Sequence, residues 1–169
     1  MEAIEALMTR HSAREFSSKP VSKKDIEEIL KAAMQAPSAR DSRPWHFIAI
    51  QERKMLDKLP EGLPYAQMCK TAQAAILVCA KLDEEKSPGY WPQDCSNAAM
   101  SILLAAHAKG LGAVWTAIYN KEDRLKFAKE VFSLPENVMP LCLIPLGYAA
   151  KKESPKNKFD EKKMHWEKW

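Results

Sequence analysis

The stretch from Ala98 to Ala108 is apolar on almost every side of the helix that it predicts. A helix at a protein surface carries polar residues along one face, so this helix must be buried on several sides, often against a partner. Burial of that extent requires a sizeable core. The chain has 169 residues, 46% hydrophobic and 28% charged, which is enough for one domain, or at most two small ones. This composition excludes disorder, collagen-like repeats and a disulfide scaffold.

Helical and strand patterns alternate along the chain. Apolar residues at helical spacing predict helices over residues 2–10, 22–36, 95–109 and 121–132, and a short helix, a turn and a second helix over 52–72. Short apolar runs predict strands over 45–51, 74–80, 112–118 and 138–148. We therefore expect one α+β domain over residues 1–169, which ends in a highly charged arm over 151–169.

Local signals mark the ends of several of these elements. Ser22, Asp94 and Asn120 are residue types that cap helix N-termini, and Gly110 fits the left-handed position that follows a helix. The predicted strand 138–148 contains two prolines, which lack the N–H that a central strand donates. This strand is therefore expected at a sheet edge or at a bulge.

Several classes of protein are excluded by the residue pattern. The longest nearly apolar run, residues 138–150, has thirteen residues and two prolines, whereas a membrane-spanning helix needs about 20. The first residues lack the basic start and apolar core of a signal peptide. The four cysteines are scattered without a Cys-x-x-Cys, which argues against a zinc site and a disulfide framework. We expect a cytoplasmic protein with no metal site and no membrane partner.

The positive charge of the chain is concentrated near its end. The net charge is only +4, and residues 151–169, with seven lysines and four acidic residues, carry +3 of it. A nucleic-acid surface usually needs a larger excess, so nucleic acid is not an expected partner.

Two short basic patterns indicate an anion site. Alternate side chains of an extended segment face the same way, so Arg10, Ser12 and Arg14 share one side. Two guanidinium groups beside a hydroxyl match the oxygens of a phosphate or another oxyanion. Lys156 and Lys158 repeat the spacing with two ammonium groups. For any one of these residues alone, a solvated surface charge is the simpler interpretation.

The order and spacing of several motifs resemble those of the FMN-dependent nitroreductases. Arg10–Phe16 is similar to the Arg-x-Ser-x-(Arg/Lys)-x-Phe segment that follows the first helix of that family, and Pro37–Trp45 to its Pro-Ser-(Ser/Ala)-x-Asn-x-Gln-Pro-Trp loop. The resemblance spans essentially the whole chain, and its further matches are 94–112, 146–148, 156–158 and 163–166. By itself, the loop 37–44 would be an ordinary connection between a helix and a strand.

The resemblance implies a fold, a cofactor and a partner. The implied fold has a central mixed, mainly antiparallel sheet flanked by helices, and its C-terminal arm extends to the partner subunit of a homodimer. FMN would lie at the dimer interface in contact with both subunits. NADH or NADPH would reduce the flavin. A small electron-poor acceptor, such as a nitroaromatic or a quinone, would then be reduced at the same place, which predicts ping-pong kinetics.

The resemblance also implies a set of FMN contacts, and no catalytic side chain, because the flavin carries the chemistry. The residues expected at the phosphate and ribityl chain are Arg10, His11, Ser12, Lys156 and Lys158. Arg14 is expected at the pyrimidine edge, where a fixed cation stabilises the reduced flavin. The other residues expected from the same subunit are Gln67, Trp115, Thr116, Ala117 and Ile118. Those expected from the partner subunit are Pro37, Ser38, Ala39 and Asp41.

Two residues depart from the family motif. Asp41 stands where asparagine is usual, and Arg43 stands where glutamine is usual. An ionised carboxylate accepts a hydrogen bond from a ribityl hydroxyl but cannot donate one. Because the two changes bring opposite charges two residues apart, we hypothesise that they form an ion pair that leaves FMN binding intact.

Two other functions remain open. Another FMN reaction on the same fold, such as reductive dehalogenation or flavin destruction, would need substrate-covering residues that no motif identifies. A flavin-free anion-binding module that uses the basic arm is a different class of protein. The acidic residues Asp160 and Glu161, and the lack of a regular aromatic platform, weigh against that second function.

Several aromatic residues have structural interpretations as good as functional ones. Tyr65, Tyr90 and Trp91, in predicted loops, suit either a substrate pocket or packing at a surface. His107, in the apolar helix, is expected to be a packed or capping histidine. The aromatic residues of the arm suggest a segment that lies over another surface.

Overall fold

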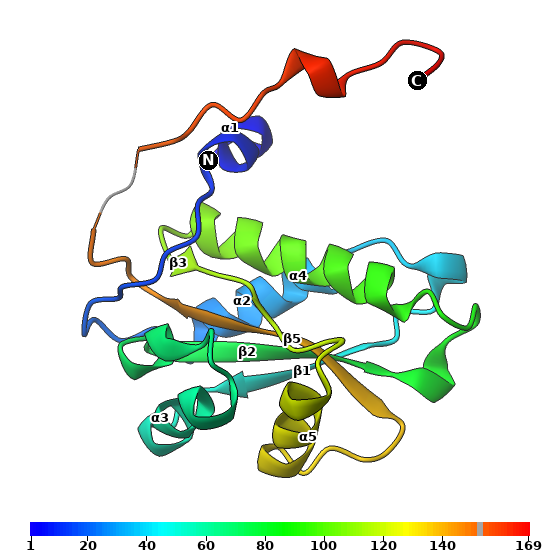
Figure 1. Cartoon of the computed structure of the whole chain (residues 1–169). Helices are drawn as coiled ribbons and strands as arrows, with labels where there is room; N and C mark the ends of the chain where they lie inside the picture. The colour runs from blue at the N-terminus through cyan, green and yellow to red at the C-terminus, as the bar shows by residue number, and fades with distance from the viewer. Residues whose placement is uncertain (152–153) are drawn as a thin grey trace.

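An antiparallel sheet with helices on both faces forms the body of the protein, as Figure 1 shows. This computed structural model describes residues 1–151 and 154–169, so Lys152 and Glu153 of the predicted arm lie outside the described residues. The strands are β1 (Trp45–Ile50), β2 (Ala74–Lys81), β3 (Gly112–Ala113), β4 (Thr116–Ala117) and β5 (Val138–Gly147). The helices are α1 (Ala3–Thr9), α2 (Lys23–Ala33), α3 (Arg53–Gly62), α4 (Trp91–Ala108) and α5 (Glu122–Val131). Short 3₁₀ turns are η1 (Ala39–Asp41), η2 (Gln67–Lys70), η3 (Leu82–Glu84) and η4 (Glu161–Lys163).

The sheet has the strand order β1-β2-β5-β3, and β4 also pairs with β5. All pairings between these strands are antiparallel, which confirms the predicted α+β class and its mainly antiparallel sheet. The parallel component is an isolated bridge between Ser12 and Ala113.

Strand β2 divides the core into two layers. Its residues Ile76 and Val78 pack in the cluster with α2 and α4, while Leu77 and Cys79 pack with α3 and α5. This alternation follows from the two-residue period of a strand. Because both faces are covered, the strand is apolar throughout, and its prediction from a continuous apolar run is confirmed.

Strand β5 is not at a sheet edge, which corrects one of the two expectations drawn from its prolines. It pairs with β2 on one side and with β3 and β4 on the other. The expected bulge is present: Val78 pairs with Cys142 and Cys79 with Pro140, so Leu141 is an extra residue. A proline carbonyl still accepts a hydrogen bond, and Pro145 receives one from Val114 N–H at 3.2 Å. The bulge, and a proline carbonyl that still accepts a hydrogen bond from the neighbouring segment, thus accommodate prolines in a central strand.

Of the four residues predicted to mark helix ends, two are confirmed and two are wrong. The Ser22 hydroxyl oxygen accepts a hydrogen bond from Asp25 N–H at 3.0 Å, and Gly110 has φ 77 after α4, so both signals are confirmed. Asp94 is not an N-cap, because α4 begins at Trp91, inside a segment predicted as loop. Asn120 is not one either: α5 begins after Lys121 and has no side-chain cap. At α4 the Trp91 N–H donates to the Glu85 carboxylate at 2.8 Å, and the Trp91 side chain is buried in the layer with α2.

Three further elements differ from the predictions. The predicted strand 112–118 is interrupted at Val114 and Trp115, which separate β3 from β4. The first helix predicted within 52–72 continues through Pro60, which lies inside the last turn of α3. The second helix expected before residue 72 is the short 3₁₀ turn η2.

Helix α4 is buried on most sides, as its composition predicted. Ala98, Ala99, Ile102 and Ala106 are buried in the layer with α2, whereas Met100 is 36% exposed. Within the described residues, no helix is long and apolar enough to cross a membrane.

Candidate functional site: two joined pockets

The segment that follows α1 is fixed along the edge of the sheet. Ser12 forms a bridge with Ala113, and Ala13 N–H donates to the Ala113 carbonyl at 3.1 Å. The close approach requires glycine at position 112, where a Cβ atom would lie 2.5 Å from the Cβ of Ala13. This anchoring makes the segment extended, as the pattern of Arg10, Ser12 and Arg14 requires.

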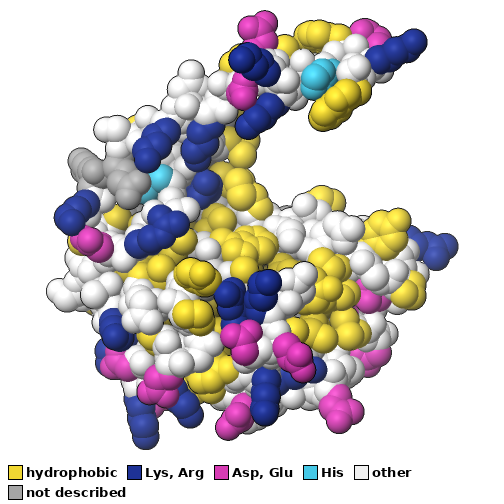
Figure 2. Space-filling model, in the orientation of Figure 1, with side chains coloured by type: hydrophobic (Ala, Val, Ile, Leu, Met, Phe, Trp, Pro, Cys, Tyr) yellow, Lys and Arg dark blue, Asp and Glu magenta, His cyan; other side chains and the backbone are white. Residues whose placement is uncertain are grey.

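A pocket of about 180 Å³ lies between this segment and the C-terminal arm. We call it the cationic pocket, and it is lined by Met8, Arg10, His11, Ser12, Arg14, Ser154, Pro155, Lys156 and Lys158. Figure 2 shows Lys and Arg side chains gathered near the base of the arm. The structure therefore brings together the two basic patterns that the sequence singled out, although they lie about as far apart in the chain as its length permits.

The cations of this pocket are not neutralised by neighbouring carboxylates. Among the described residues, no Asp or Glu oxygen lies within 4.0 Å of the charged nitrogens of Arg10, Lys156 or Lys158. Like charges held together repel each other, so a bound anion would stabilise the pocket.

Two histidines meet at the cationic pocket: His11 lines it, and His107 contacts His11. The Nε2 atom of His107 is 2.7 Å from the Thr9 hydroxyl oxygen, and the rings of His107 and His11 meet edge to face with centroids 6.0 Å apart. Burial lowers the pKa of His107, and the charges of His11 and Arg10 lower it further. The interpretation of His107 as a packed histidine is therefore confirmed, and it joins α4 to α1.

A second, wider pocket of about 560 Å³ adjoins the first through Arg14, which lines both. We call it the wide pocket, and its lining residues are Arg14, Pro64, Tyr65, Gln67, Met68, Val114, Trp115, Thr116, Ala117 and Arg124. Gln67, Trp115, Thr116 and Ala117 are thus brought to one place, while their contact with FMN stays a prediction. Together the two pockets offer a cationic end and a broader end with aromatic and aliphatic walls.

Ile118, which was expected at the same site, lies outside the wide pocket. Its side chain is fully buried in the core layer with α3 and α5. Its N–H donates to the Leu141 carbonyl at 3.1 Å, and its carbonyl accepts from Lys121 N–H at 3.2 Å. Ile118 therefore holds the pocket wall to the bulge of β5.

Arg124 lines the wide pocket, and no pattern in the sequence selects it. It lies in the first turns of α5, among several charged residues that face solvent. Tyr65, by contrast, was one of the loop aromatics considered for a pocket, and it does line this one. Only the packing of α5 against the sheet distinguishes Arg124 from its charged neighbours.

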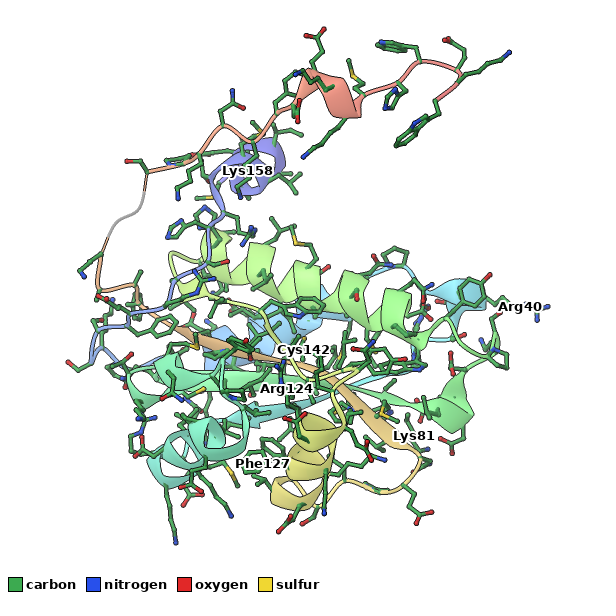
Figure 3. All side chains as sticks on the ribbon, in the orientation of Figure 1. Arg40, Lys81, Arg124, Phe127, Cys142 and Lys158 are labelled. Atoms are coloured by element: carbon green, nitrogen blue, oxygen red, sulfur yellow. The ribbon has the colours of Figure 1, made fainter. Side chains whose placement is uncertain are left out.

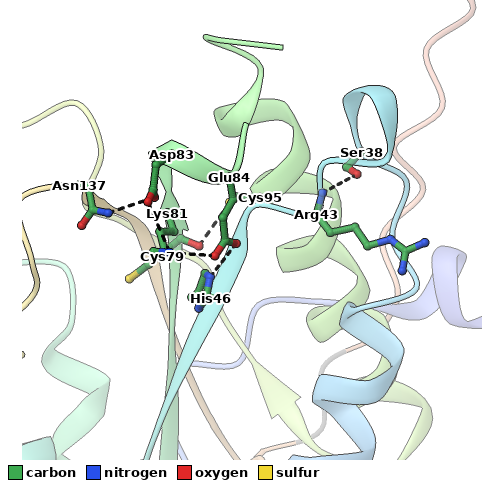
Figure 4. Close-up of polar contacts among 9 residues, drawn as sticks. All are labelled: Ser38, Arg43, His46, Cys79, Lys81, Asp83, Glu84, Cys95 and Asn137. Atoms are coloured by element: carbon green, nitrogen blue, oxygen red, sulfur yellow. Dashed lines mark hydrogen bonds and ion pairs between the residues drawn. The ribbon is translucent and has the colours of Figure 1, made fainter. Parts of the chain in front are cut away.

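The loop 37–43 has a tightly constrained backbone. Arg40, Asp41 and Arg43 have φ angles of 52°, 53° and 51°. These values lie in the left-handed region, which residues with a Cβ rarely adopt. The Ser38 hydroxyl oxygen accepts a hydrogen bond from Arg43 N–H at 3.0 Å, drawn in Figure 4. Asp94, buried in the first turn of α4, accepts from Ala39 N–H at 2.8 Å. The residue predicted as a helix cap instead fixes this loop.

The hypothesised ion pair between Asp41 and Arg43 is present in that loop. Arg43 donates from Nε to Oδ1 of Asp41 at 2.6 Å and from Nη2 to Oδ2 at 2.8 Å. The Arg43 guanidinium lowers the pKa of the Asp41 carboxyl, and the carboxylate raises the pKa of Arg43. The two departures from the family motif therefore neutralise each other within one loop.

The loop 37–43 and the cationic pocket are at opposite ends of α4. Asp94, at the start of α4, holds Ala39, while His107, at its end, contacts Thr9 beside the cationic pocket. Figure 3 labels Arg40 and Lys158 far apart, one near each end of α4. Within one chain the structure does not bring Pro37, Ser38, Ala39 and Asp41 to the pockets.

Another polar cluster, on the far side of the sheet from the arm, is an ion-pair network. The Glu84 carboxylate is 2.9 Å from Nε2 of His46 and 3.2 Å from Nζ of Lys81, and Asp83 extends the network to Asn137 (Figure 4). The hydrogen bond from His46 lowers the pKa of Glu84. No group of three or more metal-ligating side chains occurs among residues 1–151 and 154–169.

The sequence and the fold agree with one protein family. The model of the nitroreductase family matches residues 7–148, so the chain belongs to this family. A Methanothermobacter thermautotrophicus protein named "Putative NADH dehydrogenase/NAD(P)H nitroreductase" is 50% identical over the whole chain and 88% of its own length. A crystal structure with the same name from Parabacteroides distasonis is 44% identical, with a TM-score of 0.95 over 99% of this chain and 98% of that one. An FMN-dependent nitroreductase from Clostridium difficile is 30% identical, with a TM-score of 0.90 over 98% and 99% of the two chains.

The pair of Asp41 and Arg43 predicts a measurable titration. The hydrogen bond from Arg43 lowers the pKa of the Asp41 carboxyl in the folded protein. The stability that the pair contributes is therefore fully present above the pKa of Asp41 in the unfolded chain. It is lost as the pH falls through the pKa of Asp41 in the folded protein. Replacing the partner by Arg43→Gln should move the titration of the Asp41 carboxyl to higher pH, as followed by carbon-detected NMR. The matched control is Arg40→Gln, since Arg40 donates to the Lys86 carbonyl instead. Equal titrations in the two variants would contradict the pairing.

Proposed function

We propose that this protein is an FMN-dependent NAD(P)H oxidoreductase that reduces small electron-poor acceptors such as nitroaromatics or quinones. The observation that carries the proposal is the junction at Arg14 of a cationic pocket with a wide pocket. FMN has the matching shape, a phosphate at one end of a ribityl chain and a broad ring system at the other. Membership of the nitroreductase family supports the same cofactor.

The residues of the two pockets fit FMN by their chemistry. Arg10, Lys156 and Lys158 would hold the phosphate, because charged donors bind its oxygens strongly. His11 and Ser12 line the same pocket and would supply further hydrogen bonds. Arg14 would stand beside the ring system, together with Gln67 and the segment Trp115–Ala117. When bound, FMN supplies hydride transfer between a nicotinamide donor and the acceptor.

The protein's own residues bind, orient and stabilise charge. Arg14 is exposed and has no carboxylate partner among the described residues, so its charge is available to the negative charge that reduction adds. Pro64, Tyr65 and Met68 form an apolar wall that would hold flat molecules and exclude water. One pocket of about 560 Å³ would serve the donor and the acceptor in turn, which predicts ping-pong kinetics.

We also propose that the site is completed by a second copy of the chain. The loop 37–43 is held rigidly but lies away from the pockets of its own chain. Helix α1 exposes Ile4 (71%) and Met8 (66%), and the arm exposes Phe159 (69%), Trp166 (75%) and Trp169 (102%). Exposed apolar surface of this extent is typical of an interface. A homodimer would cover it and would allow Pro37, Ser38, Ala39 and Asp41 to reach the partner's FMN.

The direct test of the function is the behaviour of the purified protein with its chromophore. We expect a yellow protein that releases FMN on denaturation, is bleached anaerobically by NADH or NADPH, and regains its colour with a nitroaromatic or quinone. A colourless protein that rejects added FMN would leave only a general anion-binding module. A yellow protein that neither nicotinamide bleaches would contradict the proposed donor.

The arm provides a test of the phosphate site. Lys158 lines the cationic pocket, whereas Lys163 lies further along the arm beside Asp160. Lys158→Gln should weaken FMN binding about tenfold, because it removes one charge-assisted interaction with the phosphate. Lys163→Gln removes the same charge from the same arm and should leave the dissociation constant unchanged. Fluorescence titration of apoprotein with FMN measures both, and equal losses would exclude a specific role for Lys158.

The two-subunit site can be tested by complementation. A variant with Arg10→Gln has a damaged pocket, and a variant with Ser38→Pro has a damaged loop, so each should bind FMN weakly. A heterodimer of the two contains one site with an intact pocket and an intact loop. Coexpression should therefore restore about a quarter of the wild-type FMN sites by random pairing. Restoration of none, with sedimentation confirming dimers, would mean that each chain binds FMN by itself.

A further inference from the structure

The wide pocket contains a second cation that the FMN assignment does not use. Arg124, from the first turns of α5, lines this pocket together with Arg14, Tyr65 and Trp115. Figure 3 labels it between α5 and the sheet, well away from Lys158 in the cationic pocket. It therefore lies in the wide pocket, away from the cationic end that is proposed to hold the phosphate.

The guanidinium of Arg124 is held in place from two sides. Its Nη1 donates to the Ala117 carbonyl at 3.0 Å, and its central carbon lies 4.9 Å from the centroid of the Tyr65 ring. A stacked and hydrogen-bonded guanidinium loses little freedom when it binds a ligand, so its remaining donors are preorganised.

The charge of Arg124 is not compensated within the described part of the chain. None of the ion pairs found there includes Arg124, whereas Arg53 pairs with Asp57 at 3.0 Å. Its Nε atom is buried and has no hydrogen-bond partner. Of five N–H donors, one is used by Ala117, so the side chain has unused donors and an unpaired charge.

We propose that the acceptor of this enzyme is an aromatic compound that carries a carboxylate, and that Arg124 is the residue that selects it. This inference rests on the proposed function and specifies its substrate class. The carboxylate would pair with the guanidinium, while the ring lies against the apolar wall of Pro64, Tyr65 and Met68. A neutral amide of the same shape would leave the cation unpaired, so the site discriminates by charge.

A purely structural role for Arg124 is the competing explanation. The hydrogen bond to Ala117 and the contact with Tyr65 would then only connect α5, the loop 63–66 and β4. Such a role would affect the binding of neutral and anionic ligands alike. The two roles therefore differ in the ratio of two affinities, which a general loss of stability does not mimic.

The test compares benzoate with benzamide, which differ in charge but hardly in size, on the protein as purified. Isothermal titration calorimetry gives both dissociation constants, and perturbation of the flavin absorbance reports whether the ligand binds beside the flavin. We expect wild type to bind benzoate at least about tenfold more tightly than benzamide. Equal affinities in wild type would overturn the proposal without any variant.

Two variants test whether the preference for benzoate over benzamide depends on Arg124. Arg124→Gln should lower the ratio of benzoate to benzamide affinity about tenfold, with benzamide binding little changed. Lys126→Gln, an equal change of charge on an exposed position of the same helix, should leave the ratio as in wild type. An unchanged ratio in Arg124→Gln, or an equal loss for both ligands, would overturn the selective role.

Turnover then extends the result from binding to the reaction. The ratio of kcat/KM for 4-nitrobenzoate over 4-nitrobenzamide should fall in Arg124→Gln by the same factor as the binding ratio. Anaerobic bleaching by NADH or NADPH is measured separately. Failure of bleaching would contradict the proposed function, whereas intact bleaching without a preference for the anionic acceptor would contradict only the role of Arg124.

Discussion

The pairing of β5 on both of its sides is the constraint on which the rest of the structure depends. One side holds β2 and thereby the two core layers, and the other holds β3 and β4. The bulge at Leu141 presents a carbonyl that accepts the N–H groups of Ile118 and Tyr119. Residues 114–117 are consequently fixed as one wall of the wide pocket. A pocket with rigid walls orders its ligand at a smaller entropic cost.

The two pockets gather cations that have no acidic partner in the described part of the chain. Some cations elsewhere are matched locally: Lys109 contacts Asp25 and Glu28, and Arg43 contacts Asp41. Exposed pairs of this kind contribute little to stability, yet they neutralise the charge around them. In the two pockets, the cations have no such partners among the described residues. Unpaired positive charge is therefore available where FMN and an anionic acceptor are proposed to bind, although the net charge of the chain is only +4.

Local sequence signals were reliable where the determining interactions are local. Ser22 caps α2 through a residue three positions away, and Gly110 adopts φ 77 directly after α4. Asp94 and Asn120 carry the same kind of signal and do not cap, because α4 already begins at Trp91 and α5 begins after Lys121. The central position of β5 is not encoded locally either. Its prolines limit which hydrogen bonds it donates, but which strands lie beside it depends on the whole sheet.

The sequence by itself determined the class of fold, the buried character of α4, the ion pair of Asp41 and Arg43, and most residues of the two pockets. These follow from periodicity, from opposite charges two residues apart, and from motifs that resemble a family. Tertiary structure alone decided that Arg124 rather than another charge of α5 faces the wide pocket, and that Asp94 holds the loop at Ala39. It also decided that this loop lies at the opposite end of α4 from the cationic pocket. The physical reason is that each of these contacts joins residues distant in sequence, so no local pattern encodes it.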